Sequence, residues 1–183
     1  MYAGMEHYEP AQSMVAAVMV KYAGVGSRET PDNVLDVMFK IGKSFAQKGL
    51  LLRSGGAEGA DIAFEDGCDA GRGRKEIFYA KNNKGCIVEE RFFAQALQMA
   101  SQVHPNWGAC SEYARRLHAR NCFQVLGKEL NDPADFVVCW TKDGGPTGGT
   151  GQAIRLAISK QIPIYNLYNE KDLVALREMY KTL

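Results

Sequence analysis

The sequence predicts an α/β fold in which helices cover both faces of a mainly parallel sheet, a three-layer α/β/α arrangement. Short apolar runs of strand length alternate with segments whose apolar residues recur every three or four positions. Glycine-rich turns follow three of these runs, and each leads into a helical segment. Strands that alternate with helices in this way form parallel sheets that are buried on both sides.

The first half of the domain is predicted to contain three strands and two helices. The strands are the apolar runs 15–25, 50–53 and 76–80, and the helices are 31–48 and 60–70. Thr30 is the expected N-cap of the first helix and Pro31 its first residue, because proline tolerates that position and Thr caps well. Gly49 ends this helix, and a polar loop at 81–85 follows the third strand.

The second half is predicted to contain four helices and two strands. The helices are 89–103, 111–126, 150–160 and 171–180, and the strands are 135–140 and 162–167. His104-Pro105-Asn106 breaks the first of these helices. Pro163 indicates an edge strand or the start of a strand, since proline donates no ladder hydrogen bond.

Length and composition predict one domain, residues 14–183, behind a polar and flexible leader, residues 1–13. The apolar run 14–20 lacks a basic leading region and is too short to span a bilayer, so we expect no signal peptide and no membrane partner. The five cysteines are odd in number and contain no Cys-x-x-Cys pair. This usage favours a reducing, cytoplasmic location over a disulfide framework.

The charge balance disfavours a long nucleic acid as the main partner without excluding one. The chain carries 22 Lys and Arg against 21 Asp and Glu, a formal net charge of +1. Proteins that grip a DNA backbone usually carry a clear basic excess.

Three glycine-rich turns are the candidate ligand site. Each stands where a strand feeds a helix, which presents free backbone N–H groups and the positive end of the helix dipole to an anion. The candidate binding residues in them are Gly24, Gly26, Ser27 and Arg28; Ser54, Gly55, Gly56 and Gly59; and Gly148, Gly149, Thr150 and Gly151. All three turns are expected at the carboxyl ends of the strands, where parallel α/β sheets bind ligands.

Two common nucleotide-binding signatures are absent from these turns. The first turn lacks the third glycine of a dinucleotide fingerprint, and Arg53 stands where that fingerprint expects a carboxylate. No Gly-Lys-Ser/Thr follows any of the three turns, which excludes a Walker-type NTPase.

Glu58 and Asp61 are the candidate catalytic carboxylates, able to accept hydrogen bonds from ribose hydroxyls or to act as a base. Asp61 has a structural alternative as an acidic residue at a helix start. Arg28 can pair with a phosphate, or alternatively with Glu29 or Asp32. Thr150 can cap its helix, contact a phosphate, or do both.

We expect no metal ion and no cofactor. His118 and Cys122 lie four residues apart on one helical face with Cys110 nearby, but no further ligand at zinc spacing accompanies them. These residues therefore predict an ordinary packed face rather than a metal site.

Taken together, the motifs resemble the SLOG superfamily, which groups the Smf, or DNA-processing protein A, proteins with the LOG phosphoribohydrolases. The similarity is greatest to its YspA-like branch, common in bacteria and their phages, and it covers roughly residues 20–167. It rests on Gly26-Ser27-Arg28, residues 55–61, Arg120-Asn121, residues 134–138, Gly149-Thr150 with residues 153–157, and Ile162-Pro163-Ile164.

The resemblance implies a Rossmann-like fold, a nucleotide or nucleotide-derived ligand, and a binding role for Arg120 and Asn121. It also brings a tendency to self-associate, for which the apolar face of helix 89–103 is the candidate surface. Arg155 stands where the LOG enzymes have a catalytic glutamate. Glu58 stands where the DNA-processing proteins have an arginine suited to a DNA phosphate.

The favoured hypothesis is therefore a module that senses or sequesters a small nucleotide or ADP-ribose-like molecule. The enzymatic alternative is an N-glycosidic nucleotide hydrolase or transferase of the phosphoribohydrolase type, with Glu58 or Asp61 as the carboxylate. A weaker alternative is an accessory protein of DNA recombination that binds single-stranded DNA.

Overall fold

A computed structural model describes residues 18–79 and 90–183 of the chain. The predicted leader 1–13 and the predicted loop 81–85 lie outside the described residues. The fold is Rossmann-like, with a five-stranded sheet in the order β3-β2-β1-β4-β5 and parallel pairing throughout. The strands are β1 (Lys21–Gly24), β2 (Leu51–Ser54), β3 (Arg74–Ile77), β4 (Phe136–Cys139) and β5 (Ile164–Asn166). The predicted α/β class with a parallel sheet is confirmed.

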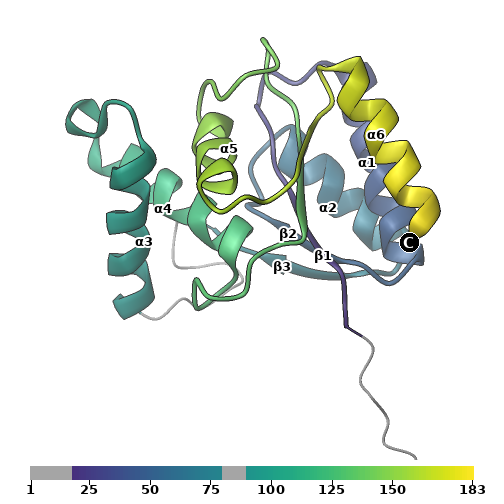
Figure 1. The fold of residues 1–183 in the computed structure, drawn as a ribbon, viewed down its shortest axis with the longest axis horizontal. Helices are drawn as coiled ribbons and strands as arrows, with labels where there is room; N and C mark the ends of the chain where they lie inside the picture. The colour runs from purple at the N-terminus through teal and green to yellow at the C-terminus, as the bar shows by residue number, and fades with distance from the viewer. Residues whose placement is uncertain (1–17, 80–89) are drawn as a thin grey trace, which may run out of the picture.

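Helices cover both faces of this sheet, as predicted (Figure 1). One face carries α1 (Asp32–Gln47), α2 (Ala60–Ala70) and α6 (Glu170–Thr182). The other carries α4 (Glu112–Leu126) and α5 (Thr150–Ser159), with α3 (Glu90–Val103) packed outside them. A short 3-10 helix that the sequence did not predict, η1 (Trp107–Ala109), joins α3 to α4.

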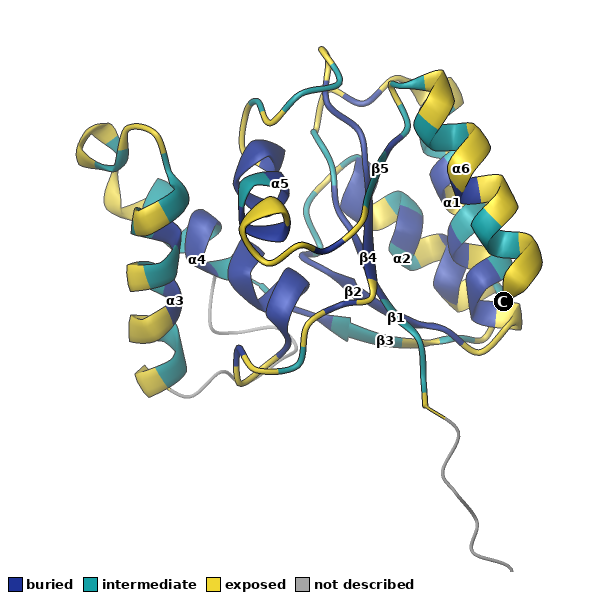
Figure 2. Ribbon diagram, in the orientation of Figure 1, coloured by how far each residue is buried: buried dark blue, intermediate teal, exposed yellow. Residues whose placement is uncertain are grey.

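Two apolar cores form because successive side chains of a strand point to opposite faces of the sheet. Tyr22 of β1 packs with Phe45 and Phe64 under α1 and α2, whereas the next residue, Ala23, belongs to the core under α4 and α5. Figure 2 shows the sheet and the inner sides of the helices buried, with exposed residues on the outer sides. This burial fixes where the strands end, and hence where the turns meet.

The apolar stripe of α3 is largely turned toward the core under α4 and α5. Phe92, Phe93 and Leu97 pack against it, and none of them is among the exposed large hydrophobic side chains. Self-association through this helix stays a prediction.

Several predicted boundaries differ from the structure. β1 begins at Lys21 rather than at residue 15, and β3 begins at Arg74, two residues before the predicted start, since it pairs with β2 directly after a glycine turn. Pro31 is the N-cap residue of α1, and Thr30 does not cap the helix. The Thr30 hydroxyl instead donates to the Ser27 carbonyl at 2.7 Å, which fixes the first glycine turn.

Arg53 is only 2% exposed and ties three segments together on one side of the sheet. Its Nε donates to Glu76 Oε2 of β3 at 2.6 Å, and its Nη2 donates to Asp132 Oδ2, in the loop before β4, at 2.6 Å. Lys21 of β1 also donates to Asp132. A buried guanidinium needs such partners, so the role of Arg53 is structural.

Asp132→Asn is expected to make the free energy of unfolding depend less on pH below about pH 4. Partial burial raises the pKa of Asp132, but the hydrogen bonds from Lys21 and Arg53 outweigh burial and hold the pKa below its usual 3.8. A lowered folded-state pKa means that this stabilisation is present above about pH 4 and is lost as the pH falls further. We expect the variant to lose roughly 1 kcal/mol at pH 7, and clearly less at pH 3, since Asp132 is half exposed.

Urea unfolding of both chains at pH 7 and pH 3 measures this difference. The exposed Asp36, replaced by asparagine, is the control and should change neither value. An equal loss at both pH values for Asp132→Asn would show that its charge is not what stabilises the fold.

Within the described residues, the helices are all too short or too polar to cross a membrane. The four described cysteines, Cys68, Cys110, Cys122 and Cys139, are free thiols. Cys86 lies outside the described residues.

Candidate functional site

A cavity of about 870 Å³ opens at the carboxyl ends of the strands, beside β1 and β4. The strand order reverses between these two strands, which is where open parallel sheets bind ligands. Its walls come from the loops after β1, β2 and β4, from one face of α4 and from the start of α5. The first and third glycine turns line this cavity, and the second turn contributes Ala57 to it.

The first turn lines the cavity with Gly26, Ser27 and Arg28. A Cβ on Gly26 would lie 2.4 Å from the Cβ of Ala60, so glycine allows α2 to begin close to this turn. Gly24 is buried and is not part of the cavity wall.

Arg28 is an exposed cation in the wall of the cavity. The alternative ion pair with Glu29 or Asp32 does not form, and no other described carboxylate lies within 4 Å of its guanidinium. The guanidinium therefore has its full hydrogen-bonding capacity available to a ligand.

The second turn has a more structural character than the sequence suggested. Its predicted binding residues do not line the cavity: Ser54, Gly55, Gly56 and Gly59. The Ser54 hydroxyl donates to the Gly24 carbonyl at 2.7 Å, which joins β2 to β1. Gly59 has φ of +86°, a conformation suited to glycine, and is the N-cap residue of α2.

The two candidate carboxylates lie in very different surroundings. Glu58 is exposed and does not line the cavity. Asp61, on the first turn of α2, is 2% exposed and does line it. Of the two, Asp61 is the carboxylate placed to meet a ligand in this cavity.

The carboxylate of Asp61 faces the backbone amides of Gly26, Gly55 and Ala57 and makes long contacts to two side chains. Its Oδ2 lies 3.4 Å from the Ala57 amide N, 3.5 Å from Gln124 Nε2 and 3.9 Å from Arg120 Nη1. Burial raises the pKa of Asp61, and the opposing effects of Arg120 and nearby backbone amides do not cancel that rise. A buried acid with long side-chain contacts is suited to a ribose hydroxyl or to proton transfer.

Arg120 and Asn121 connect the second turn to the third. Arg120 Nη1 donates to the Gly55 carbonyl at 3.2 Å, and Asn121 Nδ2 donates to the Gly149 carbonyl at 3.0 Å. Both residues line the cavity, where the resemblance placed them, although an Arg-Asn pair inside a helix is usually exposed to solvent.

The third turn presents the backbone of Gly148, Gly149 and Thr150 to the cavity. Within the described chain, no acceptor is paired with the amide N–H groups of these three residues. Gly148 and Gly149 are exposed, and a Cβ on either would have no atom within 4 Å. Three unpaired amides at the start of a ten-residue helix favour an anion.

Two predicted details of this turn need correction. Thr150 is the first residue of α5 and does not cap it, because the N-cap residue is Gly149 and no side-chain cap bond forms. Gly151 is buried and does not line the cavity. A Cβ there would lie 2.3 Å from the Pro146 carbonyl oxygen, so close packing accounts for this glycine.

Arg155 is a second cation in the cavity wall. Its Nη1 donates to the Pro146 carbonyl at 2.7 Å and its Nη2 to Gln152 Oε1 at 2.9 Å, which hold the guanidinium in place. Arg155 therefore makes this part of the cavity wall cationic.

Sequence reasoning missed Gln124 and did not assign His118 to the cavity. Both are buried and lie on the face of α4 that also carries Asn121. The signal was the spacing, since polar residues at 118, 121 and 124 recur every three positions along one helical face. His104, from the break after α3, reaches the same wall only through the tertiary fold.

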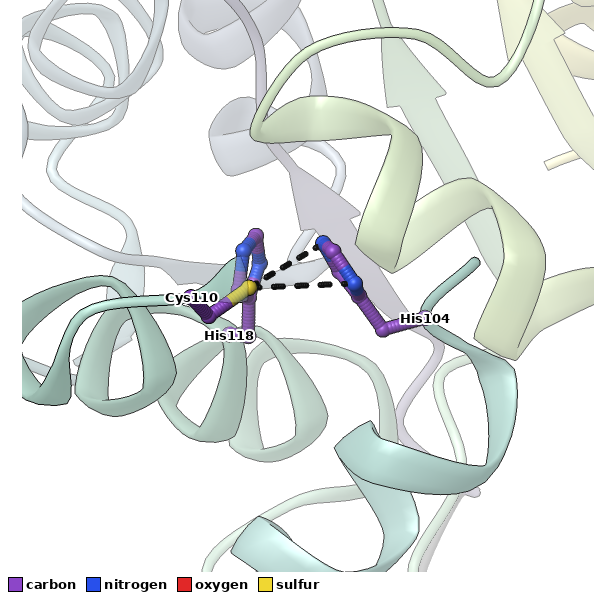
Figure 3. Close-up of side chains that lie close together, drawn as sticks. All are labelled: His104, Cys110 and His118. Atoms are coloured by element: carbon purple, nitrogen blue, oxygen red, sulfur yellow. Dashed lines mark hydrogen bonds between the residues drawn. The ribbon is translucent and has the colours of Figure 1, made fainter. Parts of the chain in front are cut away.

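The predicted neighbourhood of His118 and Cys122 is rearranged. The Cys122 thiol is buried and donates to the Ala96 carbonyl at 3.5 Å. His118 instead gathers with His104 and Cys110, whose ligand atoms all lie within 4.8 Å of one another (Figure 3).

Comparison with known proteins gives one remote structural likeness. No protein-family model matches the chain, and no curated protein matches it. Among solved structures it is similar to DNA processing protein A from Helicobacter pylori, described with a unique single-stranded DNA binding mode. The identity is 14%, the match covers 87% of this chain and 72% of that one, and the TM-score is 0.47. A likeness of this size carries no argument about function.

Proposed function

We propose that this protein is a member of the SLOG superfamily, nearest its YspA-like branch, that binds a small nucleotide or ADP-ribose-like ligand as a sensor or sequestering protein. The observation that carries the proposal is the convergence of three strand-end loops on one cavity of about 870 Å³ with unpaired backbone amides in its wall. Ligand cavities of a few hundred to about 1,000 Å³ hold small organic molecules.

The phosphate of such a ligand would lie against Gly148, Gly149 and Thr150. Among residues 18–79 and 90–183 no acceptor pairs with their amides, and the positive end of the α5 dipole lies behind them. Arg28 and Arg155 line the same cavity and would balance the charge. Gly149 has an ordinary φ of −63°, and a Cβ there would have no described atom within 4 Å, so neither backbone strain nor packing requires a glycine. Close approach of a ligand supplies the reason.

The sugar would lie near Asp61 and Gln124. The hydrogen bonds to Asp61 from Ala57 and Gln124 are long, and Gln124 Oε1 is buried with no partner among the described residues. A ribose hydroxyl both donates and accepts, so it can satisfy the two groups together.

The hydrolase alternative is favoured by one observation, the raised pKa of Asp61 in a closed environment. A group of this kind can protonate a leaving base. Against it stands Arg155, whose guanidinium in the same wall would oppose the positive charge of a ribosyl cation. We therefore rank binding above turnover.

A thermal-shift screen tests the proposal with nucleoside mono-, di- and triphosphates, ADP-ribose, NAD and cyclic nucleotides. A ligand present at 100 times its Kd should stabilise the fold by about 2.7 kcal/mol. Chromatography of each hit then separates intact ligand, the expected result, from released base, which would support the hydrolase. No stabilisation by any compound, together with salt-sensitive binding of single-stranded DNA, would overturn the proposal in favour of a DNA-binding protein.

Arg28→Ala is expected to lower the affinity for phosphorylated ligands about tenfold, because the variant loses one exposed charge-assisted contact. Tenfold in affinity is the equivalent of about 1.4 kcal/mol. The matching nucleoside without phosphate should bind both chains equally. Isothermal titration at two salt concentrations measures the effect. Arg177, exposed on α6 outside the cavity, supplies the control Arg177→Ala, which should bind like the parent chain. Equal weakening by both variants would contradict a specific phosphate contact.

A further inference from the structure

Three metal-binding side chains meet at the edge of the cavity although they come from different segments. His104 follows α3, Cys110 follows η1, and His118 lies on α4. Their ligand atoms lie within 4.8 Å of one another, and Figure 3 shows the thiol beside the His118 ring and facing the His104 ring. No other group of three or more such ligands occurs in residues 18–79 and 90–183.

The distances between these atoms are close to those of a zinc site. Cys110 Sγ lies 3.7 Å from His104 Nε2 and 3.8 Å from its Nδ1, and the two imidazole centroids are 4.5 Å apart. Zinc bonds of about 2.3 Å to sulfur and 2.0–2.1 Å to nitrogen, at tetrahedral angles, would separate S and N by about 3.6 Å. Because the sulfur is almost equally far from both nitrogens of His104, that ring must turn to aim one nitrogen at the ion.

His118 gives an independent indication of a missing partner. The side chain is 9% exposed, and its Nδ1 is buried with no hydrogen-bond partner in the described structure. A buried nitrogen without a hydrogen-bond partner costs free energy of folding, and coordination of a metal ion through that nitrogen would remove the cost.

The surroundings of both imidazoles disfavour their protonated forms. Burial lowers the pKa of His118 to about 4, with further lowering by His104, Arg155 and Arg120. Burial also lowers the pKa of His104, as does Arg155. The neighbouring arginines disfavour a bare cation, but the thiol of Cys110 would lose its proton on binding and offset part of that charge.

We propose that His104, Cys110 and His118 bind a zinc-class divalent transition metal in the wall of the cavity. Two imidazoles and a thiolate suit zinc or cobalt rather than magnesium or calcium, which prefer oxygen ligands. Three protein ligands leave a fourth position for water or an anion. His104 and His118 line the cavity, so a ligand there could reach that position.

Metal binding requires one local exchange. In the structure His104 Nδ1 accepts a hydrogen bond from the Asn106 amide N at 3.1 Å. Coordination through Nδ1 replaces that bond, and coordination through Nε2 requires Nδ1 to carry the proton and so breaks it. His104 lies in a short connection outside regular structure, which allows the ring to turn.

The test is titration of the full chain, without nucleotide, with Co²⁺ and then Zn²⁺. We expect one equivalent of Co²⁺ to bind, with a thiolate-to-cobalt charge-transfer band in the near ultraviolet that Zn²⁺ displaces. Cys110→Ser should abolish the band, and His104→Ala and His118→Gln should each weaken binding by at least about tenfold, the smallest effect expected even for an outer-shell partner. Cys122→Ala is the matched control one turn along α4, and it should keep both the band and the affinity.

A second measurement needs no substitution. Zn²⁺ should protect Cys110 from alkylation, measured on its own peptide by mass spectrometry. Absence of the band together with equal alkylation with and without Zn²⁺ would overturn the site, as would a band that survives Cys110→Ser. Nucleotide binding is measured separately with a chelator present, so failure of the metal site and failure of the proposed function are distinguishable.

Discussion

Gly149→Asp is expected to lower nucleotide affinity at least about 100-fold while leaving the fold intact. The new carboxylate would stand among the three unpaired amides proposed to receive the ligand's phosphate. Like charges brought together at a binding site cost several kcal/mol, and each 1.4 kcal/mol is a factor of ten. Any stabilising nucleotide from the thermal-shift screen can serve as the probe in isothermal titration.

The structure gives this substitution room. Gly149 has φ −63° and ψ −38°, which any residue adopts, and a Cβ there meets no atom within 4 Å. Aspartate is also favourable at the start of a helix, so the free energy of unfolding should stay the same or rise slightly. Thermal unfolding without ligand checks this expectation.

Gly108→Asp is the matched control for that experiment. Gly108 is exposed on η1, does not line the cavity, and also has no atom within 4 Å of a Cβ position. This substitution introduces the same charge and should leave the affinity for nucleotide unchanged. If Gly149→Asp binds nucleotide as well as the control does, the third turn is not the phosphate site.

The fold was predictable because its signals are local. Gly59 and Gly71 bracket an apolar helical pattern, and α2 has the predicted bounds, 60–70. The bounds of the third strand were predicted wrongly because its apolar pattern is weak. It is an edge strand, and Ile77 is its one buried residue. Its true start depends on pairing with β2, which a local pattern does not contain.

The site was predictable where backbone defines it and less so where side chains do. The turns at Gly26 and Gly149 were found because glycine spacing marks strand-to-helix junctions. The sequence did not distinguish Glu58 from Asp61, because the direction of a side chain on a tight turn depends on how the turn packs. Cys110 was noted near His118, but His104 was missed as their partner because its spacing along the chain matches no usual zinc pattern, and tertiary packing alone joins the three.

Gly67→Ala is expected to destabilise the fold by about 2 kcal/mol, because α1 and α2 touch backbone to backbone there. A Cβ on Gly67 would lie 2.1 Å from the Phe39 carbonyl oxygen of α1, and one on Gly42 would lie 2.6 Å from the Phe64 carbonyl oxygen of α2. Backbone atoms cannot rotate aside, so the helices must separate. We assign about 3 kcal/mol to this overpacking, less about 1 kcal/mol because alanine favours helix over glycine.

Thermal and urea unfolding measure the effect, and a loss of this size should lower Tm by roughly 4–8 °C in a chain of this length. Gly108→Ala is the control, with no neighbouring atom to meet, and should change stability by less than about 0.5 kcal/mol. A Gly67→Ala chain as stable as the control would mean that the two helices can move apart freely. Because α2 carries Asp61 and follows directly from the second turn, Asp61 would then not be held in a fixed position. That result would weaken the case for the proposed contact between Asp61 and the sugar.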